Sequence, residues 1–287
     1  MLILHAYAKI NLGLRILRRR SDGYHEVATV FHRVDIRDRI LIEAAGDISV
    51  RSNSPEAPEG EANICYRAAA LLGARFAEKR GAHIAIEKNI PAGAGLGGGS
   101  ADAAAVLRAL PRLWGREADG TTLEAVALLL GSDVPFFLGN RSAFASGRGE
   151  ILEFFTLEVP HTILVCHPGI HVSTAWAYGR VRPAGDLPVA ATRLLKEPRL
   201  ENRLLAERIR NDFEEPICKA HPPVRDVKEL MLRAGAAGSA LTGSGSAVYG
   251  LFDTAGRAAQ AAEQLNSCGY RTFLTPPGFQ APQEEVP

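Results

Sequence analysis

The feature that most constrains this chain is a glycine-rich stretch between a predicted strand and a predicted helix. Residues 91–102 read PAGAGLGGGSAD and include glycines at positions 93, 95, 97, 98 and 99. Glycine permits positive φ angles and a close approach of the backbone to a ligand. The helix start that follows offers unpaired N–H groups and the positive end of its dipole to an anion. We therefore predict a phosphate-binding loop at Gly93–Gly99.

This loop matches neither of two common nucleotide-binding motifs. It lacks the Gly-Lys-Ser/Thr ending of a P-loop. Its glycine spacing also departs from the dinucleotide-binding pattern. A flexible linker could be equally rich in glycine, but a linker would not lie between a strand and a capped helix. The loop therefore indicates a phosphate site of another class.

Two polar residues distant from the loop complete a candidate kinase site. Lys9 lies on a strand whose apolar side chains alternate over residues 6–16, and Asp133 follows a predicted helix end. Phosphorylation of an alcohol requires a proton acceptor and positive charge near the phosphoryl oxygens. Asp133 could accept the proton, and Lys9 could keep that carboxylate ionised. Taken singly, each is better explained as an exposed strand lysine or a turn residue, and only the glycine loop makes the functional interpretation competitive.

The pattern of elements predicts an α+β protein with two domains, residues 1–157 and 158–287. In the first domain, a half-buried strand ends at an Asp-Gly turn, and shorter strands follow over residues 27–34, 39–43 and 48–51. Asn63 can cap one helix, and Ser100 can cap the alanine-rich helix after the glycine loop.

The second domain has a different order of predicted strands and helices. Its predicted elements are a strand, a helix, two strands, a helix and a strand, at about residues 162–166, 224–234, 239–242, 247–252, 255–265 and 270–274. That order is typical of a ferredoxin-like split βαβ domain. A second glycine cluster, TGSGS at residues 242–246, is fully explained by a hairpin turn, although so small a loop could also close over phosphates.

Composition restricts the class of protein. The net charge is +1, with 46% hydrophobic residues, so bulk charge gives no reason to expect a nucleic-acid or membrane partner. The four cysteines show no metal-binding spacing and indicate free thiols in a reducing compartment. Neither an export signal nor an apolar stretch of about 18 residues is visible. We therefore expect a cytoplasmic globular protein.

Short blocks along most of the chain resemble the GHMP kinases, which include galactokinase, homoserine kinase, mevalonate kinase and phosphomevalonate kinase. The matching blocks are AKINL at 8–12, DGYH at 22–25, residues 91–104, GSDVPF at 131–136, HPG at 167–169 and LTGSGS at 241–246. AKINL and DGYH resemble in particular the kinases of 4-diphosphocytidyl-2-C-methyl-D-erythritol in non-mevalonate isoprenoid biosynthesis. The resemblance implies an N-terminal ribosomal-protein-S5-like α/β domain and a C-terminal ferredoxin-like domain.

The resemblance also implies roles for individual residues. Asp133 would be the catalytic base and Lys9 its partner, with Asn11 near the acceptor hydroxyl. The cofactors would be ATP and Mg²⁺, and Ser100 could give the metal an oxygen ligand. ATP would contact Asn63 and Lys88 near its adenine, and Pro91, Gly93, Gly95, Leu96, Gly97, Gly98, Gly99, Ser100 and Ala101 along the loop.

The acceptor would be a cytidine-diphosphate-linked polyol phosphorylated at its 2-hydroxyl. By resemblance, Tyr24 and His25 would hold its cytosine, and Tyr178 would lie on the other face of the base, with Trp176 as a competing candidate. We expect a monomer or a weak homodimer.

Other functions remain open at this point. Another kinase of the superfamily, of the homoserine or mevalonate type, would share the glycine loop, but a small acceptor without a base does not need the DGYH block. A non-catalytic ATP-binding sensor should have lost Lys9 or Asp133, and both are present.

Overall fold

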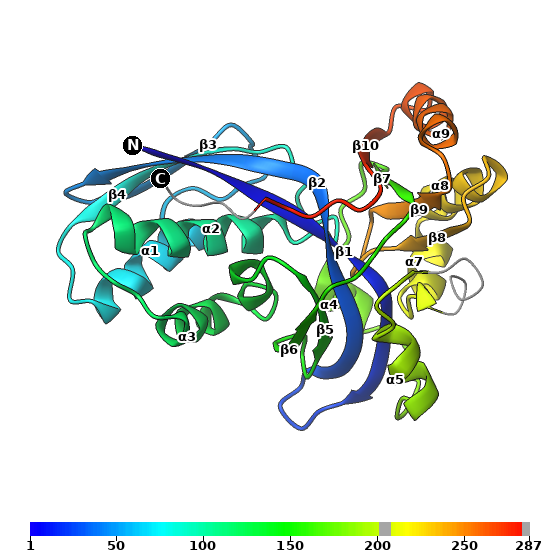
Figure 1. Cartoon of the computed structure of the whole chain (residues 1–287), viewed down its shortest axis with the longest axis horizontal. Coiled ribbons are helices and arrows are strands. Elements are labelled where there is room, and N and C mark those ends of the chain that lie inside the picture. Colours follow the sequence, from blue (N-terminus) through cyan, green and yellow to red (C-terminus); the bar gives the residue numbers. More distant parts are fainter. Residues whose placement is uncertain (201–207, 283–287) are drawn as a thin grey trace.

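The computed structural model describes residues 1–200 and 208–282, which fold around two β-sheets (Figure 1). The first sheet has six strands in the order β3-β4-β2-β5-β6, with β1 paired to β2 off that path. Its strands are β1 (Leu2–Arg19), β2 (His25–Ala45), β3 (Ile48–Ser52), β4 (Gly81–Glu87), β5 (Ser142–Ser146) and β6 (Ile151–Phe155).

The long β1–β2 hairpin forms the centre of this sheet and closes at the predicted turn. Gly23 has φ +86°, and the Arg20 N–H donates to the Tyr24 carbonyl. β2 is one continuous strand, so the prediction of two strands over residues 27–34 and 39–43 is wrong. The polar residues between the two predicted strands have partners inside the protein: the Asp35 N–H donates to Thr275 Oγ1, and buried Asp38 accepts from two backbone N–H groups.

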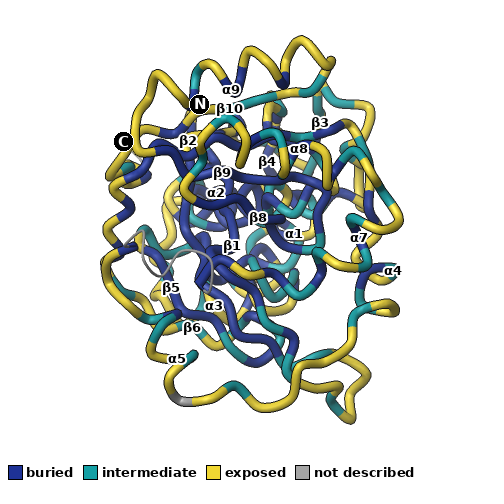
Figure 2. The backbone as a smooth tube through the Cα atoms, turned by 90° about the vertical axis from the view of Figure 1, so that its right-hand side faces the viewer, coloured by how far each residue is buried: buried dark blue, intermediate teal, exposed yellow. Residues whose placement is uncertain are grey.

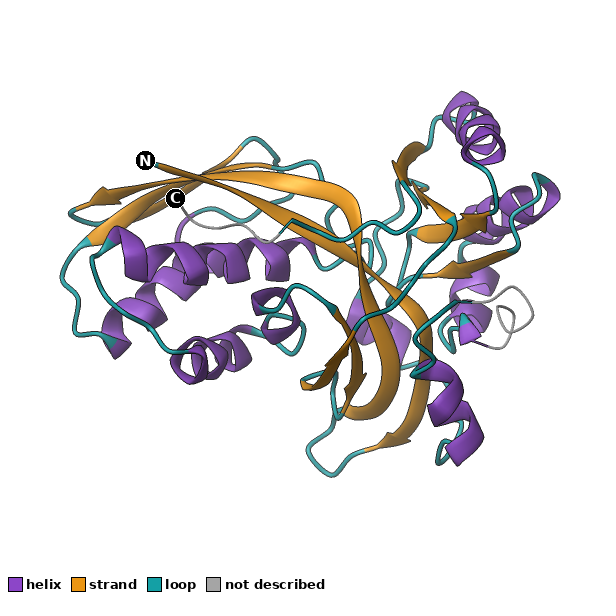
Figure 3. Ribbon diagram, in the orientation of Figure 1, coloured by secondary structure: helices purple, strands orange, loops and turns teal. Residues whose placement is uncertain are grey.

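Helices cover the side of this sheet that faces downward in Figure 3. A core cluster that includes Leu107, Trp114 and Phe136 fills the space between them. The helices are η1 (Gly60–Ala62), α1 (Ile64–Arg75), α2 (Gly98–Leu113), α3 (Gly120–Leu130) and η2 (Pro135–Leu138).

The starts of two helices test the predicted caps. Asn63 caps α1, because its side chain accepts from the Cys65 N–H at 2.8 Å. The prediction for Ser100 is wrong: α2 begins at Gly98, and Gly97 precedes it with φ +71° and ψ +21°. This left-handed conformation breaks the helical path directly before Gly98. Ser100 therefore lies in the first turn of α2, close to the free N–H groups of the helix start.

The second sheet confirms the predicted strand–helix–strand–strand–helix–strand order. Its four strands are antiparallel in the order β10-β7-β9-β8, which is the split βαβ arrangement. The elements of this half are β7 (Thr162–His167), α4 (Thr174–Tyr178), α5 (Val189–Leu195), α7 (Glu214–Ala220), α8 (Pro222–Arg233), β8 (Gly238–Leu241), β9 (Val248–Phe252), α9 (Ala255–Ser267) and β10 (Arg271–Thr275).

A shared core joins the two sheets. It packs Ile10 and Leu12 of β1 with Ile163 of β7 and Tyr249 of β9. In Figure 2, buried β1, β8 and β9 lie at the centre of the molecule. β1 is therefore buried on both faces along residues 6–14, and the prediction of a half-buried strand is wrong there. The strands divide between the sheets near residue 157, and the two-domain division stays a prediction.

The described part of the C-terminal tail packs back on the first sheet. The Gly278 N–H donates to the Val159 carbonyl at 2.9 Å, and the Phe279 ring lies 5.7 Å from that of Tyr7. Ala281 is buried. The sequence PPGFQAPQEEVP of residues 276–287 predicts a disordered tail, which is wrong for residues 276–282 because these contacts hold them; residues 283–287 lie outside the described part.

Candidate active site

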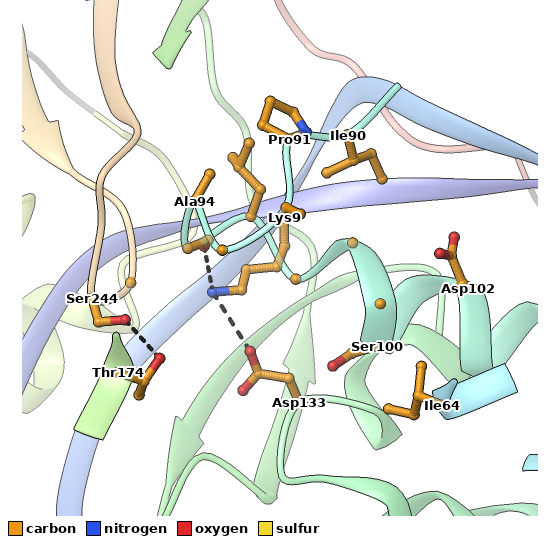
Figure 4. A pocket seen from close by; sticks show the side chains of 18 of the residues that line it. Lys9, Ile64, Ile90, Pro91, Ala94, Ser100, Asp102, Asp133, Thr174 and Ser244 are labelled. Atoms are coloured by element: carbon orange, nitrogen blue, oxygen red, sulfur yellow. Dashed lines mark hydrogen bonds and ion pairs between the residues drawn. The ribbon is translucent and has the colours of Figure 1, made fainter. Parts of the chain in front are cut away.

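A cavity of about 480 Å³ lies where the two sheets meet. The glycine loop, the start of α2 and the inner part of β1 line one side, and the second glycine loop and the end of α4 line the other. Figure 4 shows Lys9 and Asp133 pointing toward each other inside it, below Ala94 of the glycine loop. The structure thus brings together four segments that are far apart in the sequence.

The glycine loop is fixed by backbone contacts on both sides. The Lys9 N–H donates to the Leu96 carbonyl at 3.0 Å, which ties the loop to β1. The Ala247 N–H donates to the Ala94 carbonyl at 3.1 Å, which ties it to the second glycine loop. Gly95 has φ +79°, and a Cβ there would lie 2.2 Å from the Thr242 carbonyl oxygen. Only glycine fits this position, because both the backbone angle and the neighbouring loop exclude a side chain.

Lys9 is the charged centre of the cavity. Its residue is 3% exposed, and its Nζ donates to Asn11 Oδ1 at 2.7 Å and to the Gly95 carbonyl at 3.0 Å. The same Nζ lies 3.6 Å from Asp133 Oδ2, while the Asp133 side chain stays 35% exposed. Burial lowers the pKa of Lys9, and the adjacent Asp133 carboxylate opposes that shift. This arrangement holds the positively charged Lys9 ammonium between the Asp133 carboxylate and the glycine loop.

Asn11 is oriented by hydrogen bonds to Thr29 on β2 and to Thr242 in the second glycine loop. Its Nδ2 donates to Thr29 Oγ1 at 2.8 Å, and Thr29 in turn donates to the Gly13 carbonyl at 2.6 Å. Its backbone N–H donates to Thr242 Oγ1 at 3.0 Å. The amide oxygen of Asn11 therefore faces Lys9.

A second buried charge cluster lies behind the glycine loop. Lys88 Nζ binds carboxylate oxygens of Asp38 and, at 2.7 Å, of Asp102. The other Asp38 oxygen accepts from the N–H groups of Asn89 and Ile90 at 2.6 and 2.8 Å. Burial tends to lower the pKa of Lys88, but the two carboxylates outweigh it and the pKa is raised. The cluster connects β2, the entry to the glycine loop and α2.

The residues expected around ATP gather at one side of the cavity. All but one of them line it; the lining members are Asn63, Lys88, Pro91, Gly93, Gly95, Leu96, Gly97, Gly98, Gly99 and Ser100. Ala101 is not among the lining residues and is 2% exposed, as part of the first core cluster. The Lys88 ammonium and the Asn63 amide are already engaged by protein groups.

The aromatic residues expected around the acceptor form a neighbouring group. Tyr178 lines the cavity, and its ring stacks on His25 with centroids 4.9 Å apart. Tyr24 is 55% exposed and lies under the Arg148 guanidinium at 4.7 Å from the ring centre. Trp176 packs instead on His221 and is not among the cavity-lining residues. The geometry therefore favours Tyr178 over Trp176.

The chain matches known kinases over nearly all of its length. A model of the GHMP kinases N terminal domain matches residues 63–141, and one of the GHMP kinases C terminal matches residues 194–271. The 4-diphosphocytidyl-2-C-methyl-D-erythritol kinase of Chlorobium phaeobacteroides is 42% identical over 278 residues, which cover 96% of this chain and 94% of that protein. The chain belongs to this family of GHMP kinases.

Solved structures agree with this GHMP kinase fold. A crystal structure of 4-(cytidine 5'-diphospho)-2C-methyl-D-erythritol kinase matches with a TM-score of 0.79 at 39% identity, covering 95% of this chain and 98% of that one. A homoserine kinase from Cytophaga hutchinsonii matches with a TM-score of 0.69 at 17% identity, covering 99% and 97%, and shows the fold alone. The predicted superfamily, fold class and use of ATP are confirmed.

Several site residues of this GHMP kinase escaped the sequence analysis. Arg148, in the turn between β5 and β6, lines the cavity. Thr174 and Ser244 share a hydrogen bond of 3.1 Å across the cavity (Figure 4). Thr242 and Phe213 also contact site residues. Thr174 and Phe213 belong to no distinctive pattern, so only tertiary contact identifies them, whereas Thr242 and Ser244 belong to the second glycine cluster, which a hairpin turn already explained.

The part of this kinase that the structure describes contains neither a membrane-spanning helix nor a cluster of metal-binding side chains. Within residues 1–200 and 208–282, no helix has the length and apolar character needed to cross a membrane. In the same residues, no group of three or more His, Cys, Asp or Glu side chains is arranged to hold a metal ion.

Proposed function

We propose that this kinase transfers the γ-phosphate of ATP to the 2-hydroxyl of 4-diphosphocytidyl-2-C-methyl-D-erythritol, a step of non-mevalonate isoprenoid biosynthesis. The observation that carries the proposal is the buried Lys9 ammonium, which bridges the Asp133 carboxylate and the Gly95 carbonyl of the glycine loop. The names of relatives about 40% identical over nearly the whole chain support the choice of acceptor.

In the proposed reaction, Asp133 is the base. The acceptor oxygen bonds to the γ-phosphorus, the bond to the β,γ-bridging oxygen breaks, and ADP leaves while the hydroxyl proton passes to the Asp133 carboxylate. Lys9 carries positive charge beside the Asp133 carboxylate and the transferred group. Asn11 holds the Lys9 ammonium in place through its amide oxygen. The free N–H groups at the start of α2 bind the phosphates.

We propose Mg²⁺ as the second cofactor. Mg²⁺ sites with nucleotides use one or two protein oxygens together with phosphates and water. Among the described residues no cluster of three acidic or metal-binding side chains competes with that arrangement, and the Ser100 hydroxyl at the start of α2 is a suitable oxygen donor. When bound, the ion would neutralise charge on the β- and γ-phosphates.

The cytosine is proposed to bind between the aromatic residues beside the cavity. Burial, followed by the charge of Arg19, lowers the pKa of His25, so its imidazole is neutral at pH 7 and can both donate to and accept from a base edge. His25 stacks on the ring of Tyr178 in this structure. We therefore expect His25 to turn away from Tyr178 when the base enters, with Tyr24 on the opposite face.

A coupled assay of ATP turnover tests the function. The protein is supplied with Mg²⁺ and, in separate reactions, with 4-diphosphocytidyl-2-C-methyl-D-erythritol, homoserine, mevalonate and galactose. Turnover of the cytidyl compound alone supports the proposal, and turnover of another alcohol would replace the acceptor. ATP binding without any turnover would favour a sensor, although the paired Lys9 and Asp133 argue against one. Whether the chain is a monomer or a weak homodimer stays a prediction.

A further inference from the structure

We propose that the segment Asn211–Glu214, with the sequence NDFE, positions the second glycine loop against the nucleotide site. This proposal rests on the proposed function, because it assumes that the loop at residues 242–246 closes over the phosphates of ATP. The first residue of the segment, Asn211, forms an isolated β-bridge with Leu14, and its last residue, Glu214, begins α7. Asn211 itself does not line the cavity, so any effect on the reaction must pass through the loop.

Asn211 holds the base of the loop with a buried amide. Its residue is 3% exposed, and its Nδ2 donates to the Leu241 and Gly243 carbonyls at 2.8 and 2.9 Å. Its Oδ1 accepts from the Phe213 N–H at 2.9 Å. Both partners on the loop are carbonyls, so the nitrogen of the amide must face the loop. One side chain therefore fixes the backbone on either side of Thr242.

Glu214 also binds the backbone of Leu241, the residue directly before the loop. Its Oε1 accepts from the Leu241 N–H at 2.9 Å, while its Oε2 pairs with Lys228 at 2.5 Å. Both backbone polar groups of Leu241 are thus bound by side chains of the segment. A glycine-rich loop has many accessible conformations, and anchoring the residue before it reduces that freedom.

The anchored loop reaches the centre of the site through Thr242. Thr242 Oγ1 accepts the Asn11 N–H at 3.0 Å and donates to the Gly95 carbonyl at 3.3 Å. The Gly95 carbonyl is also an acceptor for Lys9. A displaced second loop would therefore release contacts of both Asn11 and the phosphate-binding loop.

The other end of the segment is fixed to β1, the strand that carries the proposed catalytic lysine. Asp212 Oδ2 accepts from the Ile16 N–H at 2.9 Å, and its backbone N–H donates to the Leu14 carbonyl at 3.0 Å. Phe213 lies edge-on to Tyr178 at 4.9 Å. The segment thus sets the spacing between β1, the second glycine loop and the ring of Tyr178, and Asn211 and Glu214 act as positioning residues.

Replacement of Asn211 tests this role by nucleotide affinity. Asn211→Asp keeps the shape of the side chain but sets a carboxylate against the two carbonyls. We expect the Kd for ADP, measured by calorimetry, and the KM for ATP to rise roughly tenfold or more, which corresponds to about 1.4 kcal/mol. The KM for the acceptor should change less. Asn211→Ala removes the donors without adding charge, should raise the Kd by a smaller factor, and covers the case in which the aspartate variant fails to fold.

Ser239→Ala is the matched control, because it removes a buried hydrogen bond to the Tyr249 carbonyl in the same sheet without touching the loop. It should lower the Tm and leave the Kd for ADP unchanged. Wild-type ADP affinity in folded Asn211 variants would overturn the proposal. So would an equal rise of the Kd in Ser239→Ala. If the wild type binds ADP but does not phosphorylate the cytidyl acceptor, the proposed function is wrong. The ADP affinities of the Asn211 variants still test the positioning role of the segment in that case.

Discussion

Asp102 should make the stability of this kinase fall as pH rises from 5 to 8. The residue is 2% exposed in α2 and shares Lys88 with Asp38. Burial raises the pKa of Asp102 to about 8; Lys88 opposes the shift, and the charge of Asp38 adds to it. At neutral pH the folded chain therefore keeps a proton on this carboxyl.

The sign and size of the effect follow from proton linkage. The ordinary pKa of 3.8 applies to Asp102 in the unfolded chain, so that state releases its proton above about pH 4. Between that pH and about 8 the folded state binds one more proton than the unfolded state. The free energy of unfolding from this group therefore decreases with rising pH, by up to about 1.4 kcal/mol per pH unit. Above about pH 8 the Asp102 carboxyl is ionised in both the folded and the unfolded state, so its contribution to the free energy of unfolding stops decreasing.

Urea unfolding of the wild type and Asp102→Asn at several pH values from 5 to 9 measures this contribution. Asparagine cannot ionise, so the stability of the wild type relative to the variant should fall up to about pH 8 and then level off. Asp119→Asn is the control: a hydrogen bond from Thr122 lowers the pKa of exposed Asp119, so its contribution is lost only under more acidic conditions. Parallel stability curves for the wild type and Asp102→Asn would refute the reasoning.

Three further variants test the site. Asp133→Asn should lower kcat by about 10²–10⁴-fold, the usual contribution of a positioned base, with the Tm and the Kd for ADP unchanged; a near-normal rate would remove Asp133 from the mechanism. His25→Ala should raise the KM of the acceptor more than that of ATP, and an unchanged acceptor KM in initial-rate measurements would place the cytosine elsewhere. Gly95→Ala should destabilise the fold and weaken ADP binding, because the new Cβ would lie 2.2 Å from the Thr242 carbonyl. Gly115→Ala, with φ +64° and open space around it, should show only the backbone cost of roughly 1–2 kcal/mol in urea unfolding, and equal losses in the two variants would argue against the loop contact.

The sequence by itself determined the features that depend on local chemistry. Glycine spacing before a helix predicted a phosphate-binding loop, and Gly93, Gly95 and Gly97 adopt the positive φ angles that glycine permits. The alternation of strands and helices after residue 160 predicted the split βαβ sheet, and the strand order confirms it. Lys9 and Asp133 were proposed from the chemistry that a kinase requires, and the fold brings them to 3.6 Å.

Only the tertiary structure decided which polar residues are buried and which partners they have. Pattern predicted a half-buried β1, but the glycine loop covers the side chain of Lys9, and this burial lowers the pKa of its ammonium. Lys88 was expected near ATP only by resemblance and Asp38 not at all, and their buried cluster forms because α2 brings Asp102 to the same point. Asn211 carried no local signal at all. Burial and pairing arise between segments that lie far apart in sequence, so no local pattern of residue types encodes them.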